Sequence, residues 1–294
     1  MLYGGGWNVE WIEPCPLKVN LCLGVGHLQA DGYHEVETLF WRLPSPEILT
    51  IREINVNNVR DRIFRSGDPF AGEHLVRRAL DLLRRHGAVL PPLEIGCSKV
   101  VPAGGGVGGG SGNAAALIRW ARRYGFASLL PEETGELGSD VPFLADGAPL
   151  AWGGGRGERL LPLSPGVQAK GFLVFPRWVS RTAEAYGRLD ALREACGLSQ
   201  ELPDREEGER ILSDLRERRV VGLLPNDFVS VSESLHGEYR EAWALAEWAG
   251  ALAWGLCGSG SGWFVVLDPR ADATSLGQVL GRLSWVRRLV AWEG

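Results

Sequence analysis

A glycine-rich segment near the middle of the chain limits the folds that the chain can adopt. Residues 104–112 contain seven glycines in nine positions. The apolar run at 93–101 before it predicts a strand that Pro102 ends, and the alanine-rich run from Ala114 predicts a helix. This order lets successive backbone N–H groups point toward one ligand beside the positive end of the helix. The segment therefore predicts a phosphate-binding loop.

Two common nucleotide-binding patterns fit this loop poorly. Gly104, Gly106 and Gly109 formally match the dinucleotide fingerprint, but the loop is not near the first strand of a βαβ unit, and the nearest acidic residue after it is Glu132. The Walker pattern requires a lysine at the start of the helix, and the loop contains none. A flexible linker is a further alternative, which the flanking strand and helix disfavour.

The rest of the chain alternates predicted strands and helices in both halves. The predicted strands are 18–25, 49–54, 93–101, 171–176 and, with a turn, 258–267. The predicted helices are 72–86, 114–124, 238–252 and 272–283. Proline becomes frequent near residue 164, and a length of 294 residues suits two domains. We therefore expect an α+β or α/β protein with domains at residues 1–164 and 165–294.

Charge and cysteine content restrict the partners and the compartment. Lys and Arg total 31 against 36 for Asp and Glu, so a net charge of −5 gives no general attraction for nucleic acid or an anionic membrane. Five scattered cysteines without C-x-x-C spacing indicate a reduced interior and disfavour zinc. No run of 18 apolar residues and no signal sequence are present. We expect a cytoplasmic monomer or homodimer that binds a small molecule.

Three further segments carry candidate functional residues. Lys18 lies in a predicted strand, and Asp140 lies between Gly138 and Pro142, which restrict the backbone. Taken alone, either residue is more often a surface ion pair or a helix cap. The segment Asp31-Gly-Tyr-His is a polar and aromatic turn that means little by itself.

Taken together, these segments resemble the GHMP kinase superfamily. Within it they are most similar to the kinases of 4-diphosphocytidyl-2-C-methyl-D-erythritol, which belong to the methylerythritol phosphate (non-mevalonate) route to isoprenoids. The matching segments occur in the family's order and span most of the chain; they are Pro16–Leu21, Asp31–Phe40, Pro102–Ser111, Leu137–Phe143 and Gly258–Phe264. The double glycine triplet combined with Asp-Gly-Tyr-His is highly specific.

The resemblance implies a fold and a reaction. The fold is a two-domain α+β GHMP kinase fold, with an N-terminal ribosomal-protein-S5-domain-2-like domain, a C-terminal ferredoxin-like domain and the active site in the cleft between them. The reaction is ATP-dependent phosphorylation of the 2-hydroxyl of the cytidine diphosphate substrate, which gives the 2-phosphate and ADP. Mg²⁺ would arrive with ATP, with Ser111 as a candidate ligand and no dedicated protein metal site.

The resemblance also implies roles for individual residues. Lys18 and Asp140 would be the catalytic pair. The ATP phosphates would be bound by Pro102, Gly104, Gly105, Gly106, Gly108, Gly109, Gly110 and Ser111. The substrate would be bound by Asn20, Tyr33, His34 and Tyr186, with the two tyrosines on either side of the cytosine ring. Strand periodicity supports Asn20, because it faces the same way as Lys18 two residues earlier.

Some residues depart from the family pattern. Gly112 stands where a second serine is usual, so we expect Gly112→Ser to be tolerated and to tighten Mg-ATP binding. Glu73 replaces an asparagine expected near adenine, Leu17 replaces an alanine beside Lys18, and residues 1–13 have no assigned role. Two alternatives stay open: another small-molecule GHMP kinase, which the Asp-Gly-Tyr-His turn disfavours, and a nucleotide-binding relative without turnover.

Overall fold

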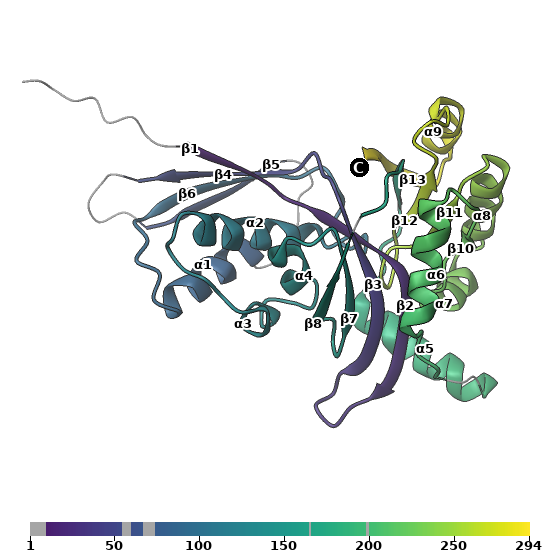
Figure 1. Cartoon of the computed structure of the whole chain (residues 1–294), viewed down its shortest axis with the longest axis horizontal. Coiled ribbons are helices and arrows are strands. Elements are labelled where there is room, and N and C mark those ends of the chain that lie inside the picture. The colour runs from purple at the N-terminus through teal and green to yellow at the C-terminus, as the bar shows by residue number, and fades with distance from the viewer. Residues whose placement is uncertain (1–9, 55–59, 67–73, 165, 198–199) are drawn as a thin grey trace, which may run out of the picture.

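The structure, a computed structural model, describes residues 10–54, 60–66, 74–164, 166–197 and 200–294. Glu73 lies outside the described residues. The described chain forms three sheets, which we call sheets A, B and C. Figure 1 shows sheet B in the middle of the molecule, with sheet A and its helices on one side and sheet C with its helices on the other. The predicted mixture of helices and sheets is confirmed.

Sheet A and the helical layer that covers it form the outer part of the N-terminal half. Its strands, in spatial order, are β1 (Glu10–Pro14), β4 (Ile48–Glu53), β6 (Leu93–Ser98) and β5 (Arg62–Ser66). The helices are α1 (Leu75–Arg85), α2 (Gly109–Arg123), α3 (Pro131–Gly135) and α4 (Val141–Asp146). Apolar residues of α1, α2 and α4 share one core with those of β4 and β6, so the helices cover one face of the sheet (Figure 1).

Sheet B carries the first part of the site. Its antiparallel strands, in spatial order, are β2 (Leu17–Leu28), β3 (His34–Leu43), β7 (Leu150–Gly154) and β8 (Arg159–Leu163). Every residue of β2 from Leu17 to Gly26 is buried, because the helical layer lies on one face and the C-terminal half on the other. Polar side chains on this strand are therefore held in fixed surroundings.

Sheet C has the connections of a ferredoxin-like domain. Its spatial order is β10 (Gly222–Leu223), β11 (Ala253–Leu256), β12 (Trp263–Leu267), β9 (Lys170–Pro176) and β13 (Val286–Glu293). Between β9 and β11 lie α5 (Thr182–Cys196), α6 (Arg205–Arg216), α7 (Phe228–Leu235) and α8 (Glu238–Trp248), and between β12 and β13 lies α9 (Thr274–Arg282). The antiparallel order β11-β12-β9-β13 with helical crossovers is the split βαβ arrangement expected for this half.

Two predicted boundaries beside the glycine segment are wrong. The helix predicted from Ala114 begins at Gly109, because Gly108 adopts a left-handed conformation (φ 69°) and the next glycines continue as helix. The strand predicted to reach Val101 ends at Ser98. Beyond it, the N–H groups of residues 100 and 101 donate to the carboxylate of Glu47 and not to a neighbouring strand.

The division of the chain after residue 164 stays a prediction. Named strands pair only within residues 10–163 or within residues 170–293 in the described chain, and an isolated bridge joins Leu23 to Asn226. The two halves nevertheless share a hydrophobic core, in which Leu17 and Leu39 lie in the same cluster as Leu173 and Phe264. A site between the halves is therefore lined on both sides by residues that pack into one core.

Three structural features bear on the expected compartment and metal content. All five cysteines are unpaired. No helix among the described residues is long and apolar enough to cross a membrane. Within the same residues, no group of three His, Cys, Asp or Glu side chains is arranged to hold a metal ion.

Candidate active site

Lys18 and Asp140 meet at the boundary between sheet B and the helical layer. The Lys18 Nζ atom lies 3.2 Å from Asp140 Oδ1, and the Lys18 side chain is 6% exposed. Asp140 is the N-terminal cap residue of α4, but its side chain makes no capping hydrogen bond. Its carboxylate is therefore free to face Lys18 and the solvent-filled space beside it. The structure brings together the two residues predicted to be catalytic.

Asn20 fixes the position of the Lys18 ammonium group. Lys18 Nζ donates to Asn20 Oδ1 (3.1 Å), which also accepts from the backbone N–H of Gly258 (3.2 Å). Asn20 Nδ2 donates to Thr38 Oγ1 (2.8 Å). An ammonium group carries three N–H donors. With Asp140 and Asn20 as partners, Lys18 keeps one donor for a bound ligand.

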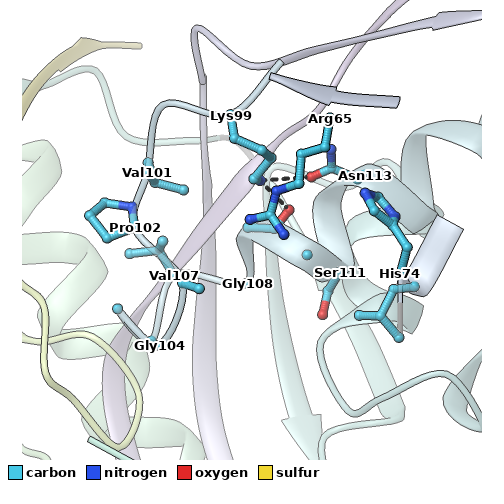
Figure 2. A pocket seen from close by; sticks show the side chains of 16 residues that line it. Arg65, His74, Lys99, Val101, Pro102, Gly104, Val107, Gly108, Ser111 and Asn113 are labelled. Atoms are coloured by element: carbon cyan, nitrogen blue, oxygen red, sulfur yellow. Dashed lines mark hydrogen bonds between the residues drawn. The ribbon is translucent and has the colours of Figure 1, made fainter. Parts of the chain in front are cut away.

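The glycine segment forms the wall of a cavity of about 360 Å³. Gly104, Gly106 and Gly108 adopt positive φ angles of 76°, 72° and 69°, which side chains other than glycine rarely allow. Figure 2 shows Ser111 at the start of α2 near His74, with Lys99 and Arg65 above it and Pro102 and Gly104 across from it. The cavity is lined by every residue predicted to bind ATP phosphates: Pro102, Gly104, Gly105, Gly106, Gly108, Gly109, Gly110 and Ser111.

A second cavity, of about 280 Å³, adjoins the first at the catalytic pair. Gly106, Gly108 and Ser111 line both cavities. A Cβ atom at Gly108 would lie 3.3 Å from Asp140 Oδ2 and 3.3 Å from Lys18 Cγ. The absence of a side chain there thus lets the loop approach the pair closely. The two cavities offer places for two ligands whose reacting groups meet beside Lys18 and Asp140.

Of the residues predicted to bind substrate, Asn20 and Tyr186 line the second cavity, and His34 contacts Tyr186 without lining it. The ring of Tyr186 lines the cavity and lies 5.1 Å from the ring of His34. His34 is oriented by the carbonyl of Gly26 (3.0 Å from Nδ1) and by Asp190 (3.2 Å from Nε2). Tyr186 also packs edge-on against Phe228, and burial raises its pKa to about 12. Tyr186 and His34 therefore form a pair of aromatic rings that their neighbours hold in place.

Tyr33 lies at the margin of the second cavity and does not line it. Its side chain is 55% exposed, and the guanidinium of Arg156 lies 3.7 Å from the centre of its ring. Arg156 lines the cavity and pairs with Asp31 (2.6 Å). Arg156 was not among the site residues predicted from the sequence, although the glycines on either side of it indicate a tight loop. Both glycines adopt positive φ angles. One face of the Tyr33 ring is thus covered by a cation.

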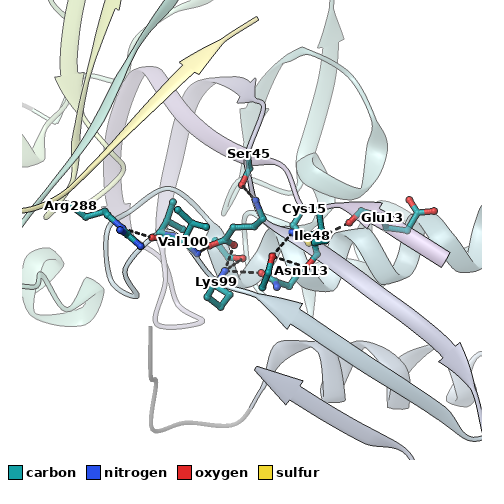
Figure 3. A network of polar contacts seen from close by, with 12 residues as sticks. Glu13, Cys15, Ser45, Ile48, Lys99, Val100, Asn113 and Arg288 are labelled. Atoms are coloured by element: carbon teal, nitrogen blue, oxygen red, sulfur yellow. Dashed lines mark hydrogen bonds and ion pairs between the residues drawn. The ribbon is translucent and has the colours of Figure 1, made fainter. Parts of the chain in front are cut away.

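A buried polar network, also missed by the sequence analysis, holds the glycine segment in place (Figure 3). Glu47, which is fully buried, accepts the backbone N–H groups of residues 100–101 (2.8 Å each) and pairs with Lys99. Lys99 Nζ also donates to the carbonyl of Gly109 (3.1 Å) and to Asn113 Oδ1 (2.9 Å). All three donors of Lys99 are therefore used within the protein. Lys99 connects the two ends of the loop and has no donor left for a phosphate.

The expectation that Gly112→Ser is tolerated is wrong. Gly112 lies in the first turn of α2, against the start of β2, and a Cβ atom there would lie 2.1 Å from the carbonyl oxygen of Pro16. Because the obstacle is backbone, we expect Gly112→Ser to lower the free energy of unfolding by about 1–3 kcal/mol or more. Urea denaturation measures this, with Gly281→Ser in α9 as the control, since nothing lies within 4 Å of a Cβ there. Equal midpoints for both variants would contradict the close packing.

Comparison with known proteins assigns the family. Residues 74–154, which contain the glycine segment and Asp140, match the model of the GHMP kinase N-terminal domain. The chain is 34% identical to 4-diphosphocytidyl-2-C-methyl-D-erythritol kinase of Solidesulfovibrio magneticus, over 90% of this chain and 91% of that protein. It is 33% identical to the enzyme of the same name from Corynebacterium efficiens, over 90% of this chain and 87% of that protein.

Solved structures agree with this assignment. A crystal structure of 4-(cytidine 5'-diphospho)-2C-methyl-D-erythritol kinase superposes with a TM-score of 0.77 at 28% identity, covering 97% of this chain and all of the other. Homoserine kinase from Cytophaga hutchinsonii, at 15% identity and a TM-score of 0.61 over 99% of this chain and 97% of the other, shares the fold. The chain belongs to the GHMP kinases, in the family of the 4-diphosphocytidyl-2-C-methyl-D-erythritol kinases.

Proposed function

We propose that this chain transfers the γ-phosphoryl group of ATP to the 2-hydroxyl of 4-diphosphocytidyl-2-C-methyl-D-erythritol. The products are the 2-phosphate and ADP. The observation that carries the proposal is the meeting of two cavities at Gly106, Gly108 and Ser111, beside the pair of Lys18 and Asp140. A donor in the first cavity and an acceptor in the second would present their reacting groups to the same two side chains.

The first cavity has the features that bind and activate the phosphates of ATP. Phosphoryl transfer has a loose transition state with charge on the γ-oxygens, so a kinase contributes mainly positioning and charge stabilisation. The amides of residues 104–110 and the N-terminal end of the 15-residue helix α2 supply that stabilisation. Mg²⁺ arriving with ATP would neutralise charge between the phosphates, and Ser111, at the junction of the cavities, is the proposed hydroxyl ligand.

The catalytic pair acts on the acceptor hydroxyl. Asp140 accepts or orients the hydroxyl proton, which places the oxygen for attack on the γ-phosphorus. Lys18 uses its remaining N–H to hold the hydroxyl and the γ-phosphate together as negative charge develops. Asn20 lines the second cavity and has one N–H of its amide left after its bond to Thr38, so this donor is proposed to bind the acceptor.

The cytidine end of the substrate would occupy the part of the second cavity that Tyr186 and Arg156 line. Tyr186 offers a ring face for stacking. The predicted substrate residue His34 would act by holding that ring in place, because its two ring nitrogens contact Gly26 and Asp190. Lys18 and Arg156 are the cationic side chains that line this cavity. Arg156 pairs with Asp31 through Nη2 and has further guanidinium N–H donors, so it is the proposed partner of the diphosphate. Tyr33 would bound the substrate at the margin of the cavity with the face of its ring that Arg156 does not cover.

Removing either tyrosine ring should weaken substrate binding. We expect Tyr33→Ala and Tyr186→Ala to raise the substrate KM about tenfold, since stacking on an aromatic ring contributes about 1–3 kcal/mol per base. The KM for ATP should change little. Steady-state kinetics with Tyr186→Phe as the control, which keeps the ring, separate stacking from the hydroxyl. If Tyr186→Ala lowers the melting temperature and leaves the substrate KM unchanged, Tyr186 has only a packing role.

A coupled assay for ADP release tests the proposed function. The purified protein is offered ATP and Mg²⁺ with the cytidyl substrate, mevalonate, homoserine or a hexose in separate reactions. ADP formation that depends on the cytidyl substrate is the expected result. Turnover with another acceptor would assign a different GHMP kinase activity. ATP binding without turnover on the cytidyl substrate would contradict the proposal as well.

A further inference from the structure

The C-terminal end of α4, the helix that begins at Asp140, is held by arginine side chains. Arg42, on β3, donates from Nη2 to the carbonyls of Phe143 (2.9 Å) and Leu144 (3.0 Å). Arg119, on α2, donates to the carbonyl of Leu144 (2.8 Å). Arg122, one turn further along α2, donates to the carbonyls of residues 145–146 (3.0 and 3.1 Å).

These bonds provide a partner for every backbone carbonyl at the C-terminal end of α4 that has no partner within the helix. The last four C=O groups of an α-helix have no partner within the helix. In α4 these belong to residues 143–146, and each accepts a hydrogen bond from Arg42, Arg119 or Arg122. We call these three residues the arginine clamp. Bonds from charged donors are roughly twice as strong as neutral ones, so the clamp is a strong attachment.

The strand pair that carries Arg42 also carries Lys18. Arg42 stands directly opposite Lys18 in the register of β3 and β2. Such neighbours lie on the same face of a sheet. Lys18 contacts the Asp140 carboxylate at the N-terminal end of α4, and Arg42 contacts the carbonyls at its C-terminal end. One pair of opposed strand residues therefore holds both ends of the helix.

The helix between them is too short to be stable alone, and it depends on the clamp together with the packing of Val141, Phe143 and Leu144, which are fully buried. It has six residues, and isolated helices shorter than about 12–15 residues are marginal in water. Its interior contact with sheet B is the stacking of Phe143 on Phe40, with ring centres 5.0 Å apart. Burial, together with the charges of Arg119 and Arg122, lowers the pKa of Arg42 to about 10, so Arg42 stays cationic at neutral pH. The three arginine cations can lie close together because each donates hydrogen bonds to backbone carbonyl oxygens.

We propose that the arginine clamp, and Arg42 above all, positions Asp140 for catalysis. Arg42 lines neither cavity, so it acts on the reaction through the placement of α4 and not by contact with substrate. This inference rests on the proposed role of Asp140. Loss of Arg42 leaves the carbonyl of Phe143 without its partner and removes one of the two donors to Leu144, which loosens this end of α4. The Asp140 carboxylate can then move relative to Lys18, while the residues that line the two cavities stay in place.

Kinetics of Arg42→Met test the clamp. We expect kcat to fall about 10- to 100-fold, since displacement of a reacting group by about 1 Å costs on the order of 10²-fold. Both KM values should stay within about twofold. Arg42→Lys, which keeps the charge on a side chain one bond shorter than that of arginine, should lie between Arg42→Met and the unaltered protein. Arg84→Met is the matched control, because Arg84 is also partly buried and bonds Asp61 on the far side of the helical layer; its kcat should not change.

A double-mutant cycle with Asp140→Asn separates positioning from general loss of stability. If Arg42 acts through Asp140, Arg42→Met should slow the Asp140→Asn variant by less than about twofold. A full additional 10- to 100-fold loss there, or an unchanged kcat in Arg42→Met alone, would overturn the proposal. If Arg42→Met does not fold, Arg119→Met takes its place in the same cycle, because Arg42 then still bonds Leu144. Asp140→Asn alone reports on the proposed function, so failure of that role is distinguishable from failure of the clamp.

Discussion

Lys18→Ala and Asp140→Asn are each expected to lower kcat by about 10²–10⁴-fold, the range typical for loss of a general acid or base. Asp140→Asn keeps the shape of the side chain but cannot accept the hydroxyl proton as a carboxylate does. Lys18→Ala removes the ammonium that bridges Asp140 and Asn20. Both substitutions remove a group that acts on the charge developing in the transition state, so the KM values should change much less than kcat.

The measurement is steady-state kinase activity, with circular dichroism and a melting curve to establish that each variant is folded. Asp146→Asn is the matched control for Asp140→Asn, because it lies at the other end of α4, is exposed and contacts neither cavity. Its kcat should match that of the unaltered protein. Near-native activity in Lys18→Ala or in Asp140→Asn would remove that residue from the mechanism.

Gly106→Ala is expected to weaken ATP binding by about 10- to 100-fold. Gly106 has φ of 72°, and a Cβ there would lie 1.8 Å from the carbonyl oxygen of Cys257 and 3.0 Å from that of Gly260. The left-handed conformation alone costs an alanine about 1–2 kcal/mol, and the backbone contact forces the loop away from the C-terminal half. About 1.4 kcal/mol corresponds to tenfold in affinity, so the two effects together account for the expected loss.

Titration calorimetry with a non-hydrolysable ATP analogue measures this change. Gly125→Ala is the control, because Gly125 also has a positive φ (73°) but has nothing within 4 Å of a Cβ; its ATP affinity should be unaltered. A side chain at Gly109 would act differently from one at Gly106, because Gly109 is helical. A Cβ there meets the side chains of Val101 (2.8 Å) and Lys99 (3.3 Å). Unchanged affinity in Gly106→Ala would contradict a phosphate-binding loop.

The parts of the site that the sequence predicted are those in short motifs. Lys18, Asp140 and the glycine loop lie in short contiguous segments with characteristic residue types. Their chemistry can therefore be predicted from the sequence alone. The α+β class was likewise predictable from alternating strand and helix patterns. The helix start at Gly109 was not predictable, because glycines are poor helix formers. Close contacts with residues distant in sequence, such as that of Gly112 with Pro16, favour glycine here.

The residues that sequence reasoning missed depend on long-range contacts. The strand β1 (Glu10–Pro14) lies mostly in residues 1–13, to which the sequence assigned no role. It pairs with β4, which is distant in sequence. Helix α5 buries only Ala185, Leu189 and Arg193, so its apolar pattern is weak. Glu47 and Arg42 become important only because the fold brings backbone groups to them that are distant in sequence.

The position of the new phosphate on the product tests the central claim most directly. The purified protein is incubated with ATP, Mg²⁺ and 4-diphosphocytidyl-2-C-methyl-D-erythritol, and the product is examined by proton-coupled ³¹P NMR. The 2-carbon bears the methyl group and no hydrogen, so a phosphate on the 2-hydroxyl should appear as a new monoester signal without three-bond coupling to a proton. A doublet or triplet would indicate a secondary or primary hydroxyl as acceptor. Either of these, or inorganic phosphate as the only new signal, would contradict the proposed reaction.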